Sequence, residues 1–352
     1  MYEISSRLLS WYDQKHRHLP WRVTPEEQTK GIRPDPYHVW LSEIMLQQTT
    51  VEAVKPYFKK FLKLWPDLSS LAKASQDDIM KAWAGLGYYS RARNLKHCAQ
   101  QLMENYGGQF PQSVKALQTL SGIGDYTAAA IAAIAFNHPV AVVDSNVERV
   151  ITRLFAIASV LPKAKAEIKE KTLKIIALNR PGDFAQAMMD LGALICTPRQ
   201  PSCYLCPLQN LCRAAKMQKT ESFPVKAPKK ERPLKTSIAF VVLNHKRQIY
   251  LEKRQGKKLL GGMTQIPNNI GIDDENGLQS APLNANWQFK GQITHIFTHF
   301  SLKLDVYYTD NVHKMNRKNG WWCDIQHLAE EALPTVMKKA ISVALPNSFK
   351  SK

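Results

Sequence analysis

Apolar residues in the first 213 positions return every three or four residues, which is the period of an amphipathic helix. Residues 3–16 show this pattern first, and Asp35 followed by Pro36 is typical of a helix start. Further helices are predicted up to Trp65, with a bend at Pro56, and over residues 76–84, 90–105, 113–119, 125–136, 145–156, 164–178 and 183–195. The polar residues 23–34 predict a loop. No strand pattern precedes residue 236 except the short run at 140–143, so this part is predicted to be all-α.

The pattern changes after Cys212. Residues 213–235 contain many lysines, three prolines and few apolar residues, which predicts a linker. Beyond it the apolar period becomes two, and Ser237–Leu243 and Gln248–Glu252 are predicted to be paired strands. Residues 300–308 alternate as a half-buried strand, and residues 334–345 predict a closing helix. We therefore predict an all-α domain at 1–213, a linker at 214–235 and an α+β domain at 236–352.

Composition narrows the kind of partner. The chain has 352 residues, a net charge of +19 and a pI of about 9.6. Such a basic protein is expected to bind a polyanion, with nucleic acid favoured over a membrane. No apolar run is long enough to span a bilayer, and the N-terminus lacks the pattern of a signal peptide. We expect a cytoplasmic protein associated with the nucleoid.

The stretch from Leu120 to Asn146 combines a glycine turn with a later carboxylate. Gly122 and Gly124 lie between two helical patterns, so backbone N–H groups are left free where the second helix begins. Such a turn binds a phosphate without contacting the bases. About twenty residues later, Asp144 ends an apolar run and opens another helix. Taken alone, the stretch also fits a plain αα-hairpin followed by an N-cap aspartate.

Four of the six cysteines are clustered in sequence. Their spacing is C-x6-C-x2-C-x5-C, formed by Cys196, Cys203, Cys206 and Cys212. Four thiolates this close can converge on zinc or on an iron–sulfur cluster. Zinc ribbons usually contain two C-x2-C pairs, and only one is present here, so the spacing favours a [4Fe–4S] cluster, with zinc as the alternative. The other two cysteines are expected to be ordinary buried thiols.

Together these motifs resemble those of the endonuclease III superfamily of helix-hairpin-helix DNA glycosylases. Residues 46–49, 85–93 and 189–196 look specifically like the MutY-type adenine glycosylases. The resemblance covers most of residues 5–213 and, more loosely, the second domain. It implies an all-α iron–sulfur domain with a [4Fe–4S] cluster, followed by an α+β Nudix-like (MutT-like) domain. It also implies a monomer that removes adenine mispaired with 8-oxoguanine or guanine from double-stranded DNA, in base excision repair.

Two carboxylates suit this chemistry, because cleavage of a glycosidic bond needs one acid and one anion. Glu43 lies on an apolar helical stripe with Val39 and Leu46, where burial would raise its pKa and keep it protonated. Asp144 lies where helix amides stabilise a carboxylate. The resemblance implies the same roles, with Glu43 as general acid toward adenine N7 and Asp144 facing the sugar cation. The alternative for Glu43 is a partly exposed helix glutamate.

The resemblance implies further residues around the sugar and the base. Tyr126 stands where bifunctional relatives carry a lysine that forms a Schiff base, which a tyrosine cannot do. Tyr126 is expected to help hold the sugar region, and Asn146 to orient groups near the aspartate. Three more positions match the adenine pocket, although they also fit a core Trp, a surface Arg and a helix-face Gln: Trp21, Arg22 and Gln186.

Contacts to DNA are expected from both domains. Gln48 and Tyr88 match residues that fill the helix once adenine has left it, although Tyr88 could simply pack against the next helix. Gly122 and Gly124 are expected to grip a phosphate. The segment Phe297-Thr298-His299 matches the family loop that senses 8-oxoguanine, or else is a strand-edge turn. Residues 259–267 are not followed by the glutamate-rich run that binds metal in Nudix pyrophosphohydrolases. This argues against a hydrolase role for the second domain.

Two rival functions remain at this stage. A bifunctional glycosylase/lyase of the endonuclease III type, acting on oxidised pyrimidines, would have a lysine at position 126 and no second domain. A catalytically silent iron–sulfur DNA-binding protein would keep the cysteines and the hairpin but would need neither Glu43 nor Asp144. The chain also departs from the family pattern at Ser145, where many relatives have glycine, and in the longer loop 23–34.

Overall fold

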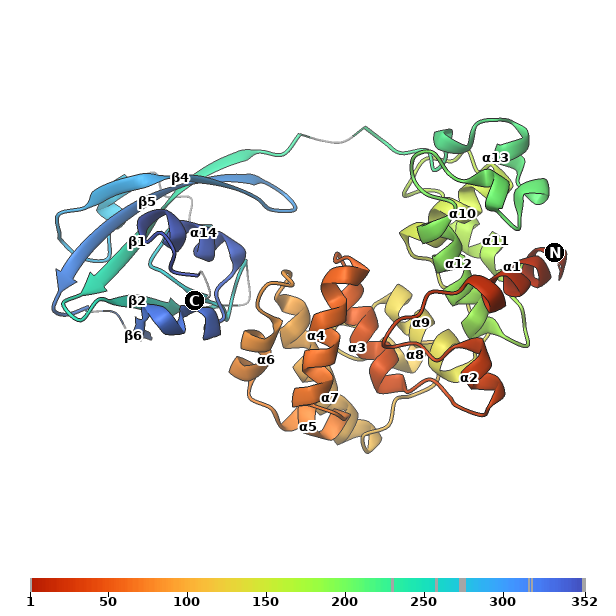
Figure 1. The fold of residues 1–352 in the computed structure, drawn as a ribbon, viewed down its shortest axis with the longest axis horizontal. Coiled ribbons are helices and arrows are strands. Elements are labelled where there is room, and N and C mark those ends of the chain that lie inside the picture. Colours follow the sequence, from red (N-terminus) through yellow and green to blue (C-terminus); the bar gives the residue numbers. More distant parts are fainter. Residues whose placement is uncertain are drawn as a thin grey trace. The chain divides into compact units, whose positions relative to one another are not determined.

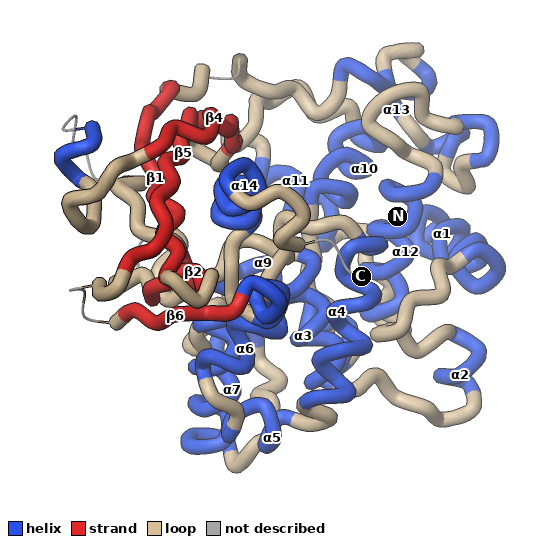
Figure 2. The backbone as a smooth tube through the Cα atoms, turned by 60° about the vertical axis from the view of Figure 1, so that its left-hand side comes forward, coloured by secondary structure: helices blue, strands red, loops and turns tan. Residues whose placement is uncertain are grey.

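The computed structural model describes residues 2–228, 231–256, 259–271, 277–315, 317 and 319–349. Residues 229 and 230 of the predicted linker lie outside this set. The chain forms two compact units, Met1–Lys73 with His97–Lys229, and Ala74–Lys96 with Lys230–Lys352. In the described residues, every β-strand belongs to the second unit (Figures 1 and 2). None of the described helices has the length and apolar character needed to cross a membrane.

The first unit is built from helices. They are α1 (Tyr2–Lys15), α2 (Pro25–Thr29), α3 (Pro36–Leu46), α4 (Val51–Leu64), α5 (Leu68–Lys73), α8 (Val114–Leu117), α9 (Asp125–Phe136), α10 (Ser145–Phe155), α11 (Lys165–Leu173), α12 (Pro181–Leu194) and α13 (Arg213–Lys216). Helix α6 (Gln76–Trp83) belongs to the second unit, and α7 (Ser90–Tyr106) begins there and ends in the first. The apolar periodicity misses only α2, α5 and α13, each of six residues or fewer. The prediction of an all-α N-terminal part is confirmed, since no strand precedes Leu234 in the described residues.

The prediction that residues 23–34 form a loop is wrong over α2. Thr24 caps this helix, because its Oγ1 accepts a hydrogen bond from the Glu27 N–H at 3.2 Å and its own N–H donates to Glu27 Oε2 at 2.8 Å. Pro25 occupies the first helical position, which its fixed backbone angle favours. Pro25 is the only buried residue of α2, so no apolar period marks the helix.

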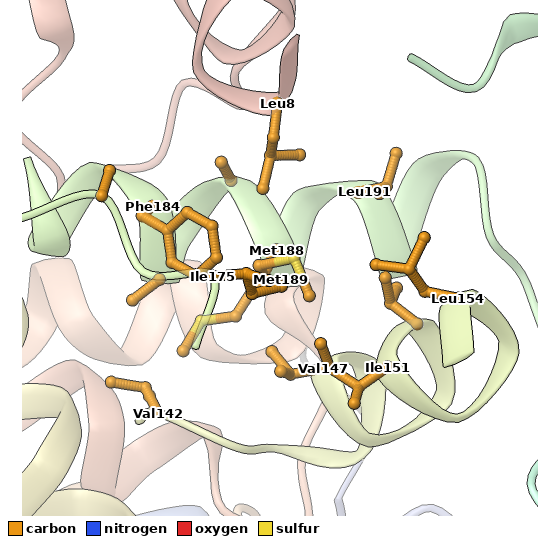
Figure 3. Packing of buried hydrophobic residues seen from close by; sticks show 14 of the residues in the cluster. Leu8, Val142, Val147, Ile151, Leu154, Ile175, Phe184, Met188, Met189 and Leu191 are labelled. Carbon is orange, nitrogen blue, oxygen red and sulfur yellow. The ribbon is translucent and has the colours of Figure 1, made fainter. Parts of the chain in front are cut away.

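Helix α12 is central to the core of the first unit, where it packs against α1, α9 and α10 (Figure 3). Met188 and Leu191 meet Val147 and Ile151 there, and each fully buried apolar side chain contributes roughly 1.5–3 kcal/mol to stability. The contact is close because position 192 is glycine: a Cβ there would lie 2.6 Å from the Cβ of Asn146. Helix α12 therefore lies directly against the start of α10.

The second unit contains a six-stranded sheet. Its strands are β1 (Leu234–Asn244), β2 (Gln248–Lys253), β3 (Thr264–Gln265), β4 (Gln288–Ile296), β5 (Ser301–Val312) and β6 (Gly320–Asp324). The order is β3-β2-β1-β5-β4, with β6 also paired to β2, and only the β1–β5 pair is parallel. Helix α14 (Thr335–Ala344) packs on β4 and β5 (Figure 1). The predicted alternation is present in β5, where Leu302, Leu304 and Val306 are buried in the core.

Candidate active site

A cavity of about 510 Å³ in the first unit brings together residues that lie far apart in the sequence. Its walls come from the segment after α1, from α3, from the turn between α3 and α4, from α9, from the start of α10 and from α12. Eight of the residues predicted from the sequence line it: Trp21, Arg22, Glu43, Gln48, Tyr126, Asp144, Asn146 and Gln186. The two carboxylates therefore face one common space.

Glu43 is buried, with 6% of its surface exposed, as the apolar stripe on α3 predicts. Burial is the strongest cause that raises its pKa to about 7, and the nearby charge of Asp144 acts in the same direction. The Tyr126 hydroxyl donates to Glu43 Oε2 at 2.8 Å and lowers the pKa, as does the charge of Arg22. Burial also raises the pKa of Tyr126 well above its usual value, so the phenol stays neutral and remains the donor.

Asp144 is the N-cap of α10. Its Oδ1 accepts from the Val147 N–H at 2.7 Å, and its Oδ2 accepts from the Asn146 side-chain amide at 2.9 Å. Both bonds fix the orientation of the carboxyl group at the start of α10. Ser145, which follows it, is exposed and lines the same cavity. The environments of the two carboxyl groups therefore differ: Glu43 is buried, whereas Asp144 accepts two hydrogen bonds at the start of a helix.

Arg149 holds Asn146 in place, and the sequence analysis missed this residue. Its Nη2 donates to Asn146 Oδ1 at 2.9 Å and to the Gly192 carbonyl at 2.6 Å, while its Nε donates to the Cys196 carbonyl at 2.7 Å. A chain of hydrogen bonds thus joins Asp144, through Asn146 and Arg149, to the start of the cysteine segment. The available signal was a charged residue on the buried face of an otherwise amphipathic helix.

The three residues that match the adenine pocket lie in the cavity wall together with Arg17, which the sequence analysis did not name. Trp21 is buried and contacts Phe58 edge to face, with ring centroids 5.4 Å apart, and Gln186 is buried on α12. Arg17 lines the cavity beside Arg22, and both bind Asp190 of α12. The arginines are therefore fixed by a carboxylate that lies behind the cavity wall.

Gln48 and Tyr88 have an unusual backbone in common, although they belong to different units. Their φ angles are 60° and 48°, in the left-handed region that costs a residue other than glycine about 1 kcal/mol or more. Gln48 is exposed in the turn after α3, and Tyr88 is 45% exposed in the turn before α7. Such strained, exposed positions are typical of side chains held for contact with a ligand.

The glycine turn joins α8 to α9. Gly122 has a φ of 79°, which favours glycine, and the buried Ile123 anchors the turn. Gly124 is the N-cap of α9 and provides no side-chain cap, so the first amides of α9 receive no side-chain bond from the N-cap. A Cβ at Gly124 would meet nothing within 4 Å, so there is open space beside these amides for an anion.

The four clustered cysteines are free thiols that follow α12 in one segment. The pKa of Cys206 is raised to about 12, mainly by burial and also by the charges of Cys196, Cys212 and Cys203. The four sulfurs therefore lie within electrostatic range of one another. Among the described residues, no group of three or more His, Cys, Asp or Glu side chains is placed to hold a metal ion. The Arg153 guanidinium donates to Cys196 Sγ at 3.3 Å.

The predicted 8-oxoguanine loop, residues 297–299, is the turn between β4 and β5 in the second unit. The Phe297 N–H donates to the Phe300 carbonyl at 2.9 Å, and the two rings stack with centroids 4.8 Å apart. The hydroxyl oxygens of Thr298 and Tyr88 lie 2.9 Å apart, and both residues line a cavity of about 450 Å³, as does His299. The structure thus groups Tyr88 with this loop inside the second unit.

Comparisons with known proteins decide the family. The family described as "HhH-GPD superfamily base excision DNA repair protein" matches residues 41–177, and "NUDIX domain" matches residues 238–343. The adenine DNA glycosylase of Buchnera aphidicola subsp. Schizaphis graminum is 33% identical over 356 residues, which cover 97% of this chain and 99% of that protein. The chain belongs to the adenine DNA glycosylase family. The sequence-based resemblance is therefore confirmed.

Other adenine DNA glycosylases are longer than this chain. The mouse protein is 46% identical over 212 residues, covering 59% of this chain, and the human protein is 35% identical over 360 residues, covering 85%. The chain spans 41% and 65% of those two relatives, which is less than two thirds of their length. Its own activity and partners are therefore considered separately below.

Solved structures confirm the fold of the first part. A thermostable thymine-DNA glycosylase superposes with a TM-score of 0.53 at 30% identity, covering 61% of this chain and 95% of that structure. Endonuclease III in a non-covalent DNA complex gives a TM-score of 0.51 at 23% identity, over 61% of this chain and 94% of that one. The predicted fold class, a helix-hairpin-helix glycosylase domain followed by an α+β Nudix-like domain, is confirmed.

Proposed function

We propose that the chain is a monofunctional adenine DNA glycosylase of base excision repair, which releases adenine mispaired with 8-oxoguanine or guanine in double-stranded DNA. One observation carries the proposal: a buried Glu43 with a pKa raised to about 7 faces the same cavity as the capped carboxylate of Asp144. The named relatives support the choice of base, and the matching family description supports the repair context. The expected cytoplasmic, nucleoid-associated location and the monomeric state are part of the same proposal.

The hydrogen bonds suggest how the proton moves. The Tyr126 hydroxyl occupies Glu43 Oε2, so the proton of the neutral acid resides on Oε1. Glu43 gives this proton to adenine N7 as the bond between the sugar C1′ and the base N9 breaks, and the bonding electron pair leaves with the base. The carboxylate of Asp144 stabilises the cationic sugar. Water then adds to C1′, and the Glu43 carboxylate accepts the proton that the water loses.

Both rival functions fit the cavity less well. A lyase needs an amine that attacks the sugar, and no lysine is among the described residues that line the cavity. A catalytically silent DNA-binding protein would not require a buried glutamate at this position. Burying an ionisable group lowers the stability of the fold, so a burial without function is not expected. Position 126 distinguishes the monofunctional glycosylase, which has a tyrosine there, from the bifunctional glycosylase/lyase, which has a lysine.

We expect the Tyr126→Lys variant to gain strand nicking, because it places an amine beside the acid at the position where bifunctional relatives hold theirs. The wild type should release adenine and leave the abasic strand intact, since it has no amine there to form a Schiff base. Borohydride trapping and gel analysis of nicking, on one abasic duplex, compare the two proteins. Tyr126→Phe is the control for loss of the hydroxyl bond to Glu43. Trapping and nicking by the wild type at the pace of base release would show that the monofunctional assignment is wrong.

Contacts to DNA are proposed for the residues in strained or open turns. Gln48 and Tyr88 would fill the space that the extruded adenine leaves in the stack. The amides after Gly122 and Gly124 would grip a phosphate, in line with a net charge of +19. The loop Phe297-Thr298-His299 would read the 8-oxoguanine, with the two stacked phenylalanine rings holding its shape. Thr298 supplies a hydroxyl that can both donate and accept a hydrogen bond.

Endonuclease III and MutY-type glycosylases bind a [4Fe–4S] cluster. We propose that Cys196, Cys203, Cys206 and Cys212 bind one in this chain. The four thiols share one electrostatic environment, and their spacing, with only one C-x2-C pair, favours a cluster over a zinc ion. Such a cluster would hold the cysteine segment together, and the guanidinium of Arg153, which donates to Cys196 Sγ, would offset its negative charge.

Protein purified without oxygen from cells supplied with iron should be brown and contain about four iron atoms per chain. Metal analysis and the visible absorption spectrum measure this. Replacing Cys206 with serine should lower the iron content, whereas replacing Cys98, a buried thiol outside the segment, should leave it unchanged. Stoichiometric zinc without iron in such a preparation would overturn the cluster assignment.

A further inference from the structure

Asp190, on α12, is fully buried with 0% of its surface exposed, and yet it carries an ionised carboxyl group. Oδ1 accepts from Arg17 Nε at 2.7 Å, and Oδ2 accepts from the Arg17 backbone N–H at 2.9 Å and from Arg22 Nη1 at 2.8 Å. These cations hold the pKa of Asp190 below its usual value although burial opposes them. The carboxylate is thus bound by two arginines from a segment about 170 residues away.

Both arginines face the cavity that contains Glu43. Each lines its wall, and among the described residues neither guanidinium has a hydrogen-bond partner other than Asp190. A guanidinium carries five donors and no acceptor, so donors remain for a ligand in the cavity. Adenine presents acceptors at N1, N3 and N7, which such donors match.

We propose that Asp190 is a positioning residue for base release, which holds Arg17 and Arg22 at the cavity wall and balances their charge opposite Glu43. This proposal rests on the proposed glycosylase function and names a residue through which the same site is controlled. Asp190 itself touches neither the base nor the sugar. It acts through the arginines that face them.

A purely structural tie between α12 and the segment after α1 would not require these charges. Apolar side chains of similar volume commonly hold two elements together as well as a buried ion pair does, because removing charges from water is costly. Here one carboxylate and two guanidiniums are buried beside a carboxyl group whose protonation matters. Their placement at the cavity wall, rather than elsewhere along α12, indicates a role in the site.

The groups that face Glu43 come from every element around the cavity. Tyr126 of α9 donates to it, Asp144 at the start of α10 repels its charge, and Arg22 attracts its charge. Behind Arg22 lie Asp190 and Arg17. Removing the charge of Asp190 leaves two unbalanced cations, which favours ionised Glu43. Removing the charge of Arg17 has the opposite effect, because Asp190 then fully balances Arg22 and less positive charge faces Glu43.

Asp183 provides a matched control on the same helix. It is 4% exposed, accepts from Arg180 Nε at 2.8 Å and from the Gln28 side-chain amide at 2.8 Å. Arg180 also binds Asp13 of α1, so this cluster ties the start of α12 to α1. Asp183 lines a different cavity from the one that contains Glu43. Asp183→Asn therefore removes a comparable buried carboxylate without changing the charge at the proposed site.

The test is the pH profile of single-turnover adenine release from a duplex with adenine opposite 8-oxoguanine. Asp190→Asn should move the alkaline limb to lower pH, and Arg17→Gln should move it to higher pH. A displacement of one pH unit changes the rate on that limb about tenfold. Asp183→Asn should leave the limb in the wild-type position. Thermal melting, measured on all variants, reports loss of stability separately.

Coincident alkaline limbs for Asp190→Asn, Arg17→Gln and the wild type would overturn the proposal. If Asp190→Asn does not fold, the test rests on Arg17→Gln, because Arg17 is partly exposed. An alkaline limb at the wild-type pH in Arg17→Gln then overturns the proposal. A shift in Asp183→Asn equal to that in Asp190→Asn would also overturn it, because the effect would then be structural. A wild type that releases no adenine refutes the glycosylase function itself, which is a separate outcome.

Discussion

Replacing Glu43 with glutamine should abolish measurable adenine release while binding of the mismatched duplex survives. Glutamine has nearly the same size and keeps an oxygen that can accept from Tyr126, but it cannot give a proton to adenine N7. Loss of a general acid slows a reaction by about 10²–10⁴-fold. Single-turnover release of base, followed by alkaline cleavage of the abasic strand, measures the rate, and fluorescence anisotropy measures binding.

The wild-type rate should also fall as the pH rises through about 7. The pKa of Glu43 is raised to that value, so the protonated form that the reaction requires is present below it and lost above it. Glu52, an exposed helix glutamate on α4, supplies the control, and Glu52→Gln should behave as the wild type does. Near-normal turnover by Glu43→Gln would remove Glu43 from the mechanism.

The second large effect is expected at Asp144. Asparagine at this position keeps an oxygen that accepts from the Val147 N–H, so α10 stays capped, but it loses the negative charge that faces the sugar cation. Removing one preorganised electrostatic contact from a transition state costs roughly 10²–10³-fold in rate. The single-turnover assay should show this loss in Asp144→Asn, with a melting temperature close to that of the wild type.

Two further variants separate the charge from the cap. Asp144→Ala loses both, so it should also lose about 1 kcal/mol of stability. Asp35 is the N-cap of α3 and lies outside the cavity, and Asp35→Asn should retain activity. An Asp144→Asn enzyme as fast as the wild type would show that no anion is needed there.

Much of the fold could be predicted because its long helices are strongly periodic. The start of α3 at Pro36 follows from a capping aspartate and a proline at the first helical position. The start of α9 follows from the glycine turn before it. Glu43 could be placed on a buried face for the same reason. The apolar stripe needs no tertiary information, and it was sufficient to predict the burial that raises the pKa of this residue.

The parts that could not be predicted depend on contacts between distant residues. Asp190 and Arg17 are 173 positions apart, and nothing in either segment identifies the other as its partner. Arg149 lies on a helix face that burial would normally reserve for apolar residues, and its role is visible only once Asn146 and Cys196 are placed. Helix α2 depends on a polar capping box, which apolar periodicity does not detect.

The most direct test of the glycosylase function is base release from a panel of duplexes. The panel contains adenine opposite 8-oxoguanine, guanine or thymine, together with thymine-glycol and uracil duplexes. The account predicts that adenine is released, fastest opposite 8-oxoguanine, that thymine glycol and uracil are retained, and that the abasic strand stays intact. Release of thymine glycol with strand cleavage, or no release from any duplex, would contradict it.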